Sequence, residues 1–244
     1  MRFKGTALLA AVLVGIVSYY FLIDLPSEKR KNKEKDRAEK VILFDSENVK
    51  GISFTKGEIT IALKRLGIDE WQMTAPVNAK GDASAVSGFV SFLNNLNFTR
   101  VVEESPKDLA PFGLDTPDLK IILSMKNGET KGVRVGDDHP MGNKVYLSLL
   151  NGSRVLAASV TKNRLDRKVH DLRDKTILDF KTPQIKKIEF IRNGKTLNLI
   201  KDKESWQVLE NKIIAKGNET EITNLLKTIQ TAKIEQFVEE QPEQ

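Results

Sequence analysis

The chain of 244 residues has two histidines, His139 and His170, and they are the first residues to consider for catalysis or metal binding. Asp137 and Asp138 directly precede His139, and two carboxylates with one imidazole resemble a cluster of metal ligands. Because glycines flank them on both sides, the same three residues are also ordinary polar turn residues. We favour the turn, so the sequence predicts no metal site.

His170 stands beside Asp171, Arg173 and Asp174, a set that suggests acid–base chemistry. Such chemistry needs a nucleophile, a metal or a second catalytic group, and no serine, lysine or metal partner follows from the spacing. We favour an Arg173–Asp174 pair that stabilises a linker. The sequence therefore predicts no catalytic residue and no cofactor-binding residue.

Motifs of the common enzyme classes do not occur elsewhere in the chain. There is no G-x-S-x-G elbow, P-loop or G-x-G-x-x-G, and the glycines of "GVRVGDDHPMG" lie between predicted strands instead of opening a helix. The chain also has no cysteine. This excludes disulfides, thiolate metal sites, a cysteine nucleophile and lipoprotein acylation.

The elements that would position any site come in two similar copies. The phrase "WQMTAPVNAKG" begins at Trp71 and returns as "WQVLENKIIAKG" at Trp206. The number of residues from Trp71 to Trp206 is too large for the period of a solenoid repeat. It indicates duplication of a whole structural unit, with a truncated second copy. Exposed tryptophans can bind sugars or peptides, but we favour a core position for both. Other matching pairs at nearly the same offset are Ile52 with Ile188, Phe54 with Phe190, Val86 with Ile222 and "VEE" at 102–104 with 238–240.

Each copy predicts a small antiparallel sheet with one amphipathic helix on its apolar face. Apolar and polar residues alternate over 50–65 and over 186–201, which indicates two hairpins, the second around Asn193-Gly194. A third strand carries the tryptophan. After a cap at Asp82 or Ser84, the apolar residues fall at helical spacing. These residues are Val86, Phe89, Val90, Leu93 and Leu96.

Hairpin signals at Asn127-Gly128 and Asn151-Gly152 predict a four-stranded meander over 118–159, and a short helix is expected over 159–169. The predicted fold class is α+β: a duplicated antiparallel-sheet-plus-helix unit with a β-meander between the copies, preceded by one transmembrane helix. The expected segments are a tail at 1–4, an anchor at 5–25, a charged linker at 26–40, a first unit at 41–110, the meander and connecting helix at 111–175, and a second, truncated unit at 176–244.

Residues 5–23 contain no charge, and at ~1.5 Å per residue a helix of this length matches the thickness of a bilayer. Tyr19 and Tyr20 stand near one end, where aromatic rings favour the interface. A cleaved signal peptide would have a shorter apolar run and a small-x-small site. We therefore predict an uncleaved single-pass anchor, with the lipid bilayer as partner through residues 5–25.

The net charge of +6 comes mostly from residues 29–40, which hold seven basic and three acidic residues. This linker either touches anionic headgroups or is a solvated spacer, and no motif predicts nucleic-acid binding. The positive-inside rule would keep the folded part in the cytoplasm. A short N-terminus before a long apolar run is instead typical of a signal anchor, so we expect an extracytoplasmic domain on the inner membrane.

Several motifs occur in a fixed order: the tryptophan strand, a helix, "PFGLDTP" at 111–117, "GDDHPMG" at 136–142 with Tyr146, and "LRDKTILDF" at 172–180. In this order they resemble the bacterial domain of unknown function 4340, over residues 41–244. The resemblance implies a membrane-anchored envelope protein, often encoded beside ABC-type transporters of the gliding-motility kind, and it transfers no catalytic residue. The structural motif residues are Trp71, Trp206, Gly113, Leu114, Pro117, Arg173 and Asp174, and Phe112 is a candidate partner contact.

We accordingly expect a non-enzymatic accessory or scaffolding protein, with ABC transporter subunits or other envelope proteins as partners. Free sheet edges and hairpin tips are the expected contact surfaces. Two alternatives stay open. One is an envelope hydrolase or lyase with a site near His139 or His170, and the other is a purely structural spacer.

Overall fold

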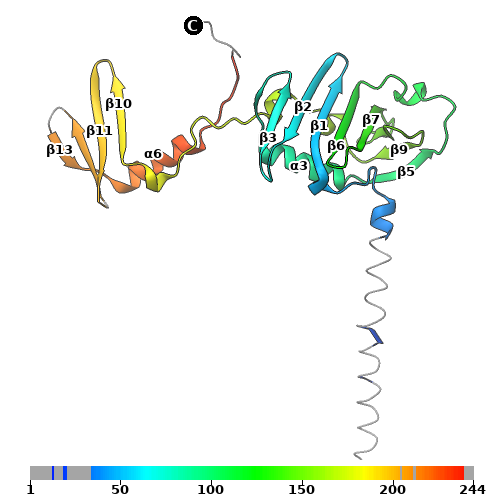
Figure 1. Ribbon diagram of the computed structural model, residues 1–244, viewed down its shortest axis with the longest axis horizontal. Coiled ribbons are helices and arrows are strands. Elements are labelled where there is room, and N and C mark those ends of the chain that lie inside the picture. Colours follow the sequence, from blue (N-terminus) through cyan, green and yellow to red (C-terminus); the bar gives the residue numbers. More distant parts are fainter. Residues whose placement is uncertain (1–12, 14–18, 21–33, 204, 211–212, 239–244) are drawn as a thin grey trace, which may run out of the picture. The chain divides into compact units, whose positions relative to one another are not determined.

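The computed structural model describes residues 13, 19–20, 34–203, 205–210 and 213–238 (Figure 1). The chain divides into two compact units, Met1–Arg173 (unit 1) and Asp174–Gln244 (unit 2). Together they form a mixed α+β fold dominated by antiparallel sheet, as the sequence predicts.

The predicted tail at 1–4 and nearly all of the predicted anchor at 5–25 lie outside the described residues, as does the first part of the charged linker. In the part of the chain that the structure describes, no helix is both long and apolar enough to cross a membrane. Residues 34–38 form a short helix at the end of the linker.

Unit 1 is built on one nine-stranded sheet with the strand order β4-β3-β2-β1-β6-β7-β8-β9-β5 (Figure 1). All neighbouring strands are antiparallel. The strands are β1 (Val49–Lys56), β2 (Ile59–Arg65), β3 (Trp71–Ala75), β4 (Ala79–Lys80), β5 (Phe98–Glu103), β6 (Leu119–Met125), β7 (Thr130–Asp138), β8 (Val145–Leu149) and β9 (Val155–Ala158).

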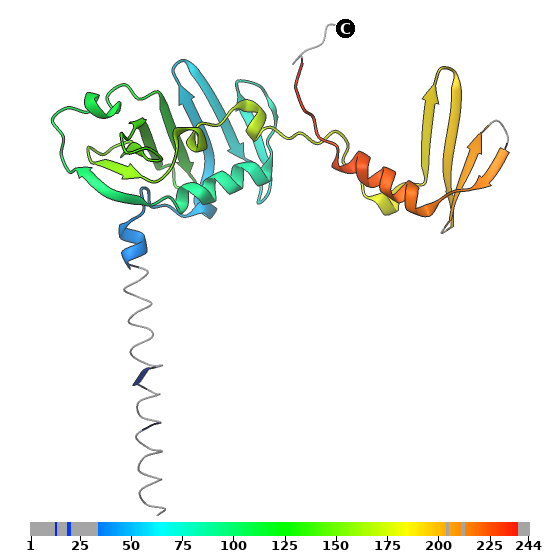
Figure 2. The same ribbon diagram turned by 180° about the vertical axis from the view of Figure 1, so that it is seen from behind.

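The helix α3 (Ala83–Asn94) lies along this sheet (Figure 2). Of the two predicted caps, Asp82 is the one that starts the helix, because its Oδ1 accepts a hydrogen bond from the Ala85 N–H at 3.0 Å. The remaining helical turns of unit 1 are η2 (Ser46–Asn48), η3 (Ala110–Phe112), α4 (Lys162–Leu165) and α5 (Val169–Leu172).

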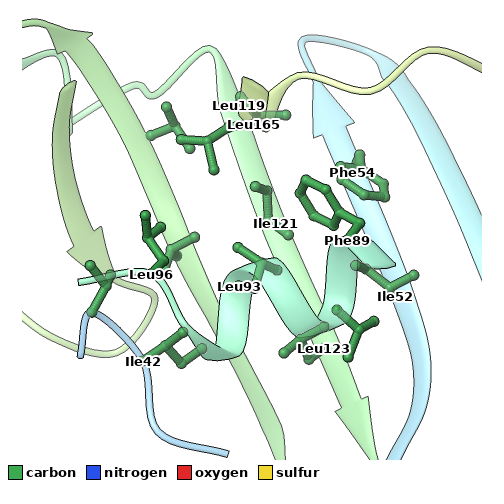
Figure 3. Packing of buried hydrophobic residues seen from close by; sticks show 14 of the residues in the cluster. Ile42, Ile52, Phe54, Phe89, Leu93, Leu96, Leu119, Ile121, Leu123 and Leu165 are labelled. Carbon is green, nitrogen blue, oxygen red and sulfur yellow. The ribbon is translucent and has the colours of Figure 1, made fainter. Parts of the chain in front are cut away.

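The core of unit 1 lies between α3 and the middle of the sheet (Figure 3). Phe89 of α3 packs on Phe54 of β1, with ring centroids 5.0 Å apart. Leu93, one turn further along α3, is 1% exposed and faces the same apolar layer as Ile121 and Leu123 of β6. The helical spacing of α3 and the alternation of β1 and β6 therefore bring their apolar sides together.

The meander is part of this sheet and not a separate segment between the two copies. β1 pairs with β6, so that Phe54 lies opposite Ile121 and Ile52 lies opposite Leu123. This pairing satisfies backbone groups of β1 that would otherwise form an open edge. The structure consequently has no boundary at residues 110–111, and unit 1 runs on to Arg173.

Two further elements differ from expectation. Residues 98–103 form β5, which pairs with the distant β9 and was not predicted because its apolar residues do not alternate. The helix expected over 159–169 is split into α4 and α5. The backbone is extended at Asp166 and Lys168, and the Lys168 N–H donates to the Asp171 carboxylate at 3.0 Å to start the second turn.

Unit 2 has a four-stranded antiparallel sheet, β10-β11-β12-β13, followed by one helix. The Asn193-Gly194 hairpin is confirmed, since both residues have positive φ and the pair Arg192–Lys195 closes the turn. The small core consists of Leu199, Trp206, Ile222 and Leu226. The elements are η4 (Thr182–Gln184), β10 (Lys187–Arg192), β11 (Lys195–Asp202), β12 (Ser205–Glu210), β13 (Ile213–Lys216) and α6 (Glu219–Thr231).

We predict that Leu93→Ala destabilises unit 1 by ~2–5 kcal/mol, because it leaves a cavity under α3. In a Trp206→Phe background, Trp71 is the sole tryptophan and its fluorescence in urea reports unit 1 alone. Ser91→Ala, at an exposed position of the same helix, is the control. Equal unfolding midpoints for the two variants would contradict this packing.

Candidate functional site

Two of the motifs noted in the sequence, at 111–117 and 136–146, pack against each other at one end of the unit 1 sheet. Phe112 contacts Tyr146 edge-on, with ring centroids 5.2 Å apart. His139 contacts the same Tyr146 ring at 5.1 Å. Phe112, the candidate partner contact, is thus half-buried among rings instead of fully exposed.

His139 is 8% exposed and holds a turn. Its Nδ1 accepts a hydrogen bond from the Met141 N–H at 3.1 Å, and its own backbone N–H donates to the Lys144 carbonyl at 2.9 Å. An Nδ1 that accepts a hydrogen bond leaves the proton of a neutral imidazole on Nε2. Among the described residues, no group of three or more His, Cys, Asp or Glu side chains is arranged to hold a metal ion.

Two glycines allow the motifs to pack this closely. Gly113 has a φ of 64°, and a Cβ there would lie 2.6 Å from the Asp137 carboxylate. A Cβ on Gly136 would lie 2.1 Å from the Phe112 carbonyl oxygen. Beside them Leu114 is completely buried and Pro117 is half-buried. Gly113, Leu114 and Pro117 therefore shape and fix this loop.

We predict that Gly136→Ala destabilises unit 1 by ~1–3 kcal/mol, since the added methyl group must push the 111–117 loop away. Gly88→Ala is a control that should stabilise unit 1 instead of destabilising it. Its Cβ would meet nothing within 4 Å, and alanine stabilises a helix by ~1 kcal/mol relative to glycine. The Trp71 fluorescence assay measures the stability of both variants. An unchanged stability of Gly136→Ala would refute the close approach of Gly136 to the Phe112 carbonyl.

The motif at 172–180 spans the boundary between the units. The Leu172 carbonyl accepts a hydrogen bond from the Asp82 N–H at 2.8 Å, and Arg173 bridges to Gly81. The Asp174 Oδ1 accepts from the Thr176 N–H at 2.9 Å within unit 2. The Arg173–Asp174 pair itself stays a prediction. His170 lies on α5 and is exposed.

The tryptophans occupy equivalent buried positions in the two units. Trp71 is 1% exposed and Trp206 is 4% exposed. The Gly81 N–H donates to the Trp71 carbonyl at 2.8 Å, and the Gly217 N–H donates to the Trp206 carbonyl at 2.7 Å. Both tryptophans thus belong to the core of their unit and are not surface binding residues.

One electrostatic contact ties the β1–β2 hairpin to the end of α4. The Lys56 ammonium donates a hydrogen bond to the Asp166 carboxylate, and this bond raises the pKa of Lys56 above its ordinary value of 10.5. A lysine is already charged below that pH, so Lys56 keeps its positive charge across the neutral range.

The largest difference between the units lies at one edge of their sheets. β1 pairs with β2 and β6, whereas β10, the equivalent strand, pairs only with β11 within the described residues. Phe190 is equivalent to Phe54, because each lies two residues before the pair that closes its hairpin. Phe54 is 2% exposed and Phe190 is 37% exposed. Unit 2 therefore presents an open strand edge with an exposed aromatic ring.

The sheet face of unit 2 that points away from α6 is also apolar. Ile191 is 73% exposed, Ile214 is 68% exposed and Ile200 is 37% exposed. They lie on this face because Ile188, Leu199 and Trp206 pack on the α6 side and strand side chains alternate. The equivalent residues of unit 1 are polar: Thr55 for Ile191, Lys64 for Ile200 and Asn78 for Ile214.

The open edge and this apolar face, together called the β10 surface, are the candidate functional site. The sequence predicts free sheet edges as contact surfaces in general but does not single out these residues. A comparison of the two copies position by position contains the signal, because isoleucine replaces polar residues only in the second copy.

The fold defines an α+β protein dominated by antiparallel sheets and divided into two compact units. The chain belongs to the family described as Domain of unknown function (DUF4340), whose match covers residues 71–244. Searches of curated proteins and of solved structures found no match.

Proposed function

We propose that this protein is a membrane-anchored, non-enzymatic accessory protein of the bacterial cell envelope that binds a partner protein through the β10 surface, beside an ABC-type transport system. The observation that carries this proposal is the open β10 edge, where Phe190 is exposed although the equivalent Phe54, which is flanked by β6 and packed on Phe89 of α3, is buried.

The backbone of β10 is arranged for strand addition. The Lys201 N–H donates to the Lys186 carbonyl at 2.8 Å, and antiparallel bonding alternates with a period of two residues. Ile188, Phe190 and Arg192 therefore direct their backbone groups toward β11, while Lys187, Glu189 and Ile191 direct theirs outward. A partner strand gains these outward donors and acceptors.

The internal pairing of β1 with β6 supports the kind of strand that fits. In β6, "LKIILSM", apolar residues at alternate positions face Ile52 and Phe54. A partner strand with the same alternation covers Ile188 and Phe190. Lys187 and Arg192 near the two ends of β10 favour acidic residues at the ends of that strand, because opposite charges stabilise cross-strand pairs.

The apolar outer face supplies a second contact area for the same partner. Leu209 and Ile214 are directly opposite each other on β12 and β13, and Ile200 lies on the adjacent strand β11. An apolar patch that one copy carries and the other lacks is typical of a binding surface. The shared strand order supports a duplicated unit in which the second copy acquired binding.

We also propose a membrane anchor and a location for the protein. The anchor at 5–25, which is uncharged over 5–23, would hold the protein in the inner membrane, with both units outside the cytoplasm. The family resemblance supports an envelope role. His139 uses its Nδ1 to hold a turn, which favours a binding protein over a hydrolase or lyase with a site at this residue.

We predict that Glu189→Pro abolishes partner binding without unfolding unit 2. Proline removes an outward N–H but no bond to β11, and edge strands tolerate it there. A photoreactive residue at Ile191 should crosslink one envelope protein in native membranes, and Glu189→Pro should lower the yield about tenfold or more, as expected for ~1.4 kcal/mol.

Glu189→Ala is the matched control, because it removes the same carboxylate but keeps the N–H. Trp206 fluorescence in a Trp71→Phe background checks that unit 2 stays folded. Equal crosslinking by the proline and alanine variants would rule out strand addition at this edge.

The location gives a separate prediction. Glu58 lies exposed at the tip of the β1–β2 hairpin, and the chain has no native cysteine. A Glu58→Cys variant should react with a membrane-impermeant maleimide once any outer membrane is permeabilised. Labelling that requires rupture of the inner membrane would place unit 1 in the cytoplasm instead.

A further inference from the structure

Unit 1 contains a cavity of about 460 Å³ beside the segment that leads in from the linker. Its wall is formed by residues 37–43, the start of β5, the start of β7 and the hairpin between β8 and β9. The cavity lies within the range of ~300–1,000 Å³ that is usual for small-molecule sites. It is separate from the β10 surface, which belongs to unit 2.

Many of the residues that line this cavity are apolar. Ile42 and Leu156 are 4% exposed, and Phe98 and Leu150 line the cavity with them. Leu43 is 47% exposed and Leu149 is 40% exposed, and both also line the cavity. Aliphatic side chains held open to water favour a hydrocarbon occupant, because covering them removes apolar surface from water.

The charged part of the lining is mainly cationic. Arg37, Lys40, Lys131 and Arg154 line the cavity together with one acid, Glu129. Arg154 is engaged by Glu104 at 2.7 Å, and Lys131 donates to the Leu43 carbonyl at 2.9 Å. Arg37 and Lys40 make no ion pair with any described residue. These two are the cations that face a ligand, so the complementary headgroup is an anion.

The cavity follows the proposed anchor in the chain, and this indicates that the ligand comes from the membrane. Residues 26–36 connect the proposed anchor to Arg37, and eleven residues reach at most ~40 Å when extended and ~17 Å when helical. If the anchor spans the bilayer, the cavity lies within this reach of the lipid surface. This step rests on the proposed function.

We propose that this cavity binds an anionic phospholipid of the surrounding membrane, with an acyl chain inside the cavity and the phosphate at Arg37 and Lys40. The lipid would fix the orientation of unit 1 above the bilayer. An apolar segment of a partner protein is the competing occupant.

The test uses the full-length chain in vesicles that contain phosphatidylglycerol with a photoactivatable group on its acyl chain. After illumination, the label should be found on peptides covering 37–43 and 149–156. Arg37→Glu with Lys40→Glu should lower this labelling about tenfold or more, since each basic residue near anionic lipid contributes ~1 kcal/mol. Leu149→Glu should lower it by blocking entry of the chain.

The control is Lys50→Glu with Lys107→Glu, which makes the same change of charge at exposed positions outside the cavity. Trp71 fluorescence verifies that unit 1 stays folded in each variant. Equal labelling by a phosphatidylcholine probe would overturn the anionic headgroup. Absence of label at these peptides would overturn lipid binding and leave the cavity to a partner segment.

Flotation of the vesicles separates this inference from the proposed anchor. Protein that floats but is not labelled at the cavity refutes the lipid site and keeps the anchor. Protein that does not float refutes the anchor. The cavity is then tested with the same probe in detergent micelles, where its labelling does not depend on insertion.

Discussion

An exposed row of backbone donors and acceptors along β1 is the constraint on which the arrangement of unit 1 depends. The chain satisfies it with β6, and this choice draws the meander, β5 and the loop at 111–117 into one sheet with one core. Phe54 and Ile121 are then opposite each other under α3. The same row on β10 has no partner among the described residues, and Phe190 and Ile191 on this strand are exposed.

The two units share a set of stabilising contacts and differ on the outer faces of their sheets. Both keep the tryptophan, the glycine that bonds to its carbonyl, and the capped helix, since these hold the sheet to the helix. The outer faces differ, because unit 1 has threonine, lysine and asparagine where unit 2 has isoleucine. Under the proposed function, both units keep the residues that stabilise them and unit 2 alone carries the binding surface.

Elements that depend on residues close in sequence were predicted correctly, whereas pairings between strands far apart in the chain were not. The Asn193-Gly194 turn and the spacing of α3 depend on neighbours in sequence, so they could be predicted from the residues alone. The pairing of β5 with β9 depends on strands far apart in the chain, and alternation cannot choose among such partners. The exposure of Phe190 could not be predicted from the sequence either. Its environment differs from that of Phe54 through a missing neighbour, not through its own sequence.

The two ends of α3 lie where the chain enters and leaves unit 1. At the C-terminal end of the helix, the Val41 N–H donates to the Leu96 carbonyl at 2.8 Å, and at the N-terminal end the Asp82 N–H donates to the Leu172 carbonyl at 2.8 Å. A helix of twelve residues, ~18 Å long, therefore separates the points where the chain enters and leaves unit 1. A force applied between residues 40 and 174 would load these two hydrogen bonds together with the packing of α3 on the sheet.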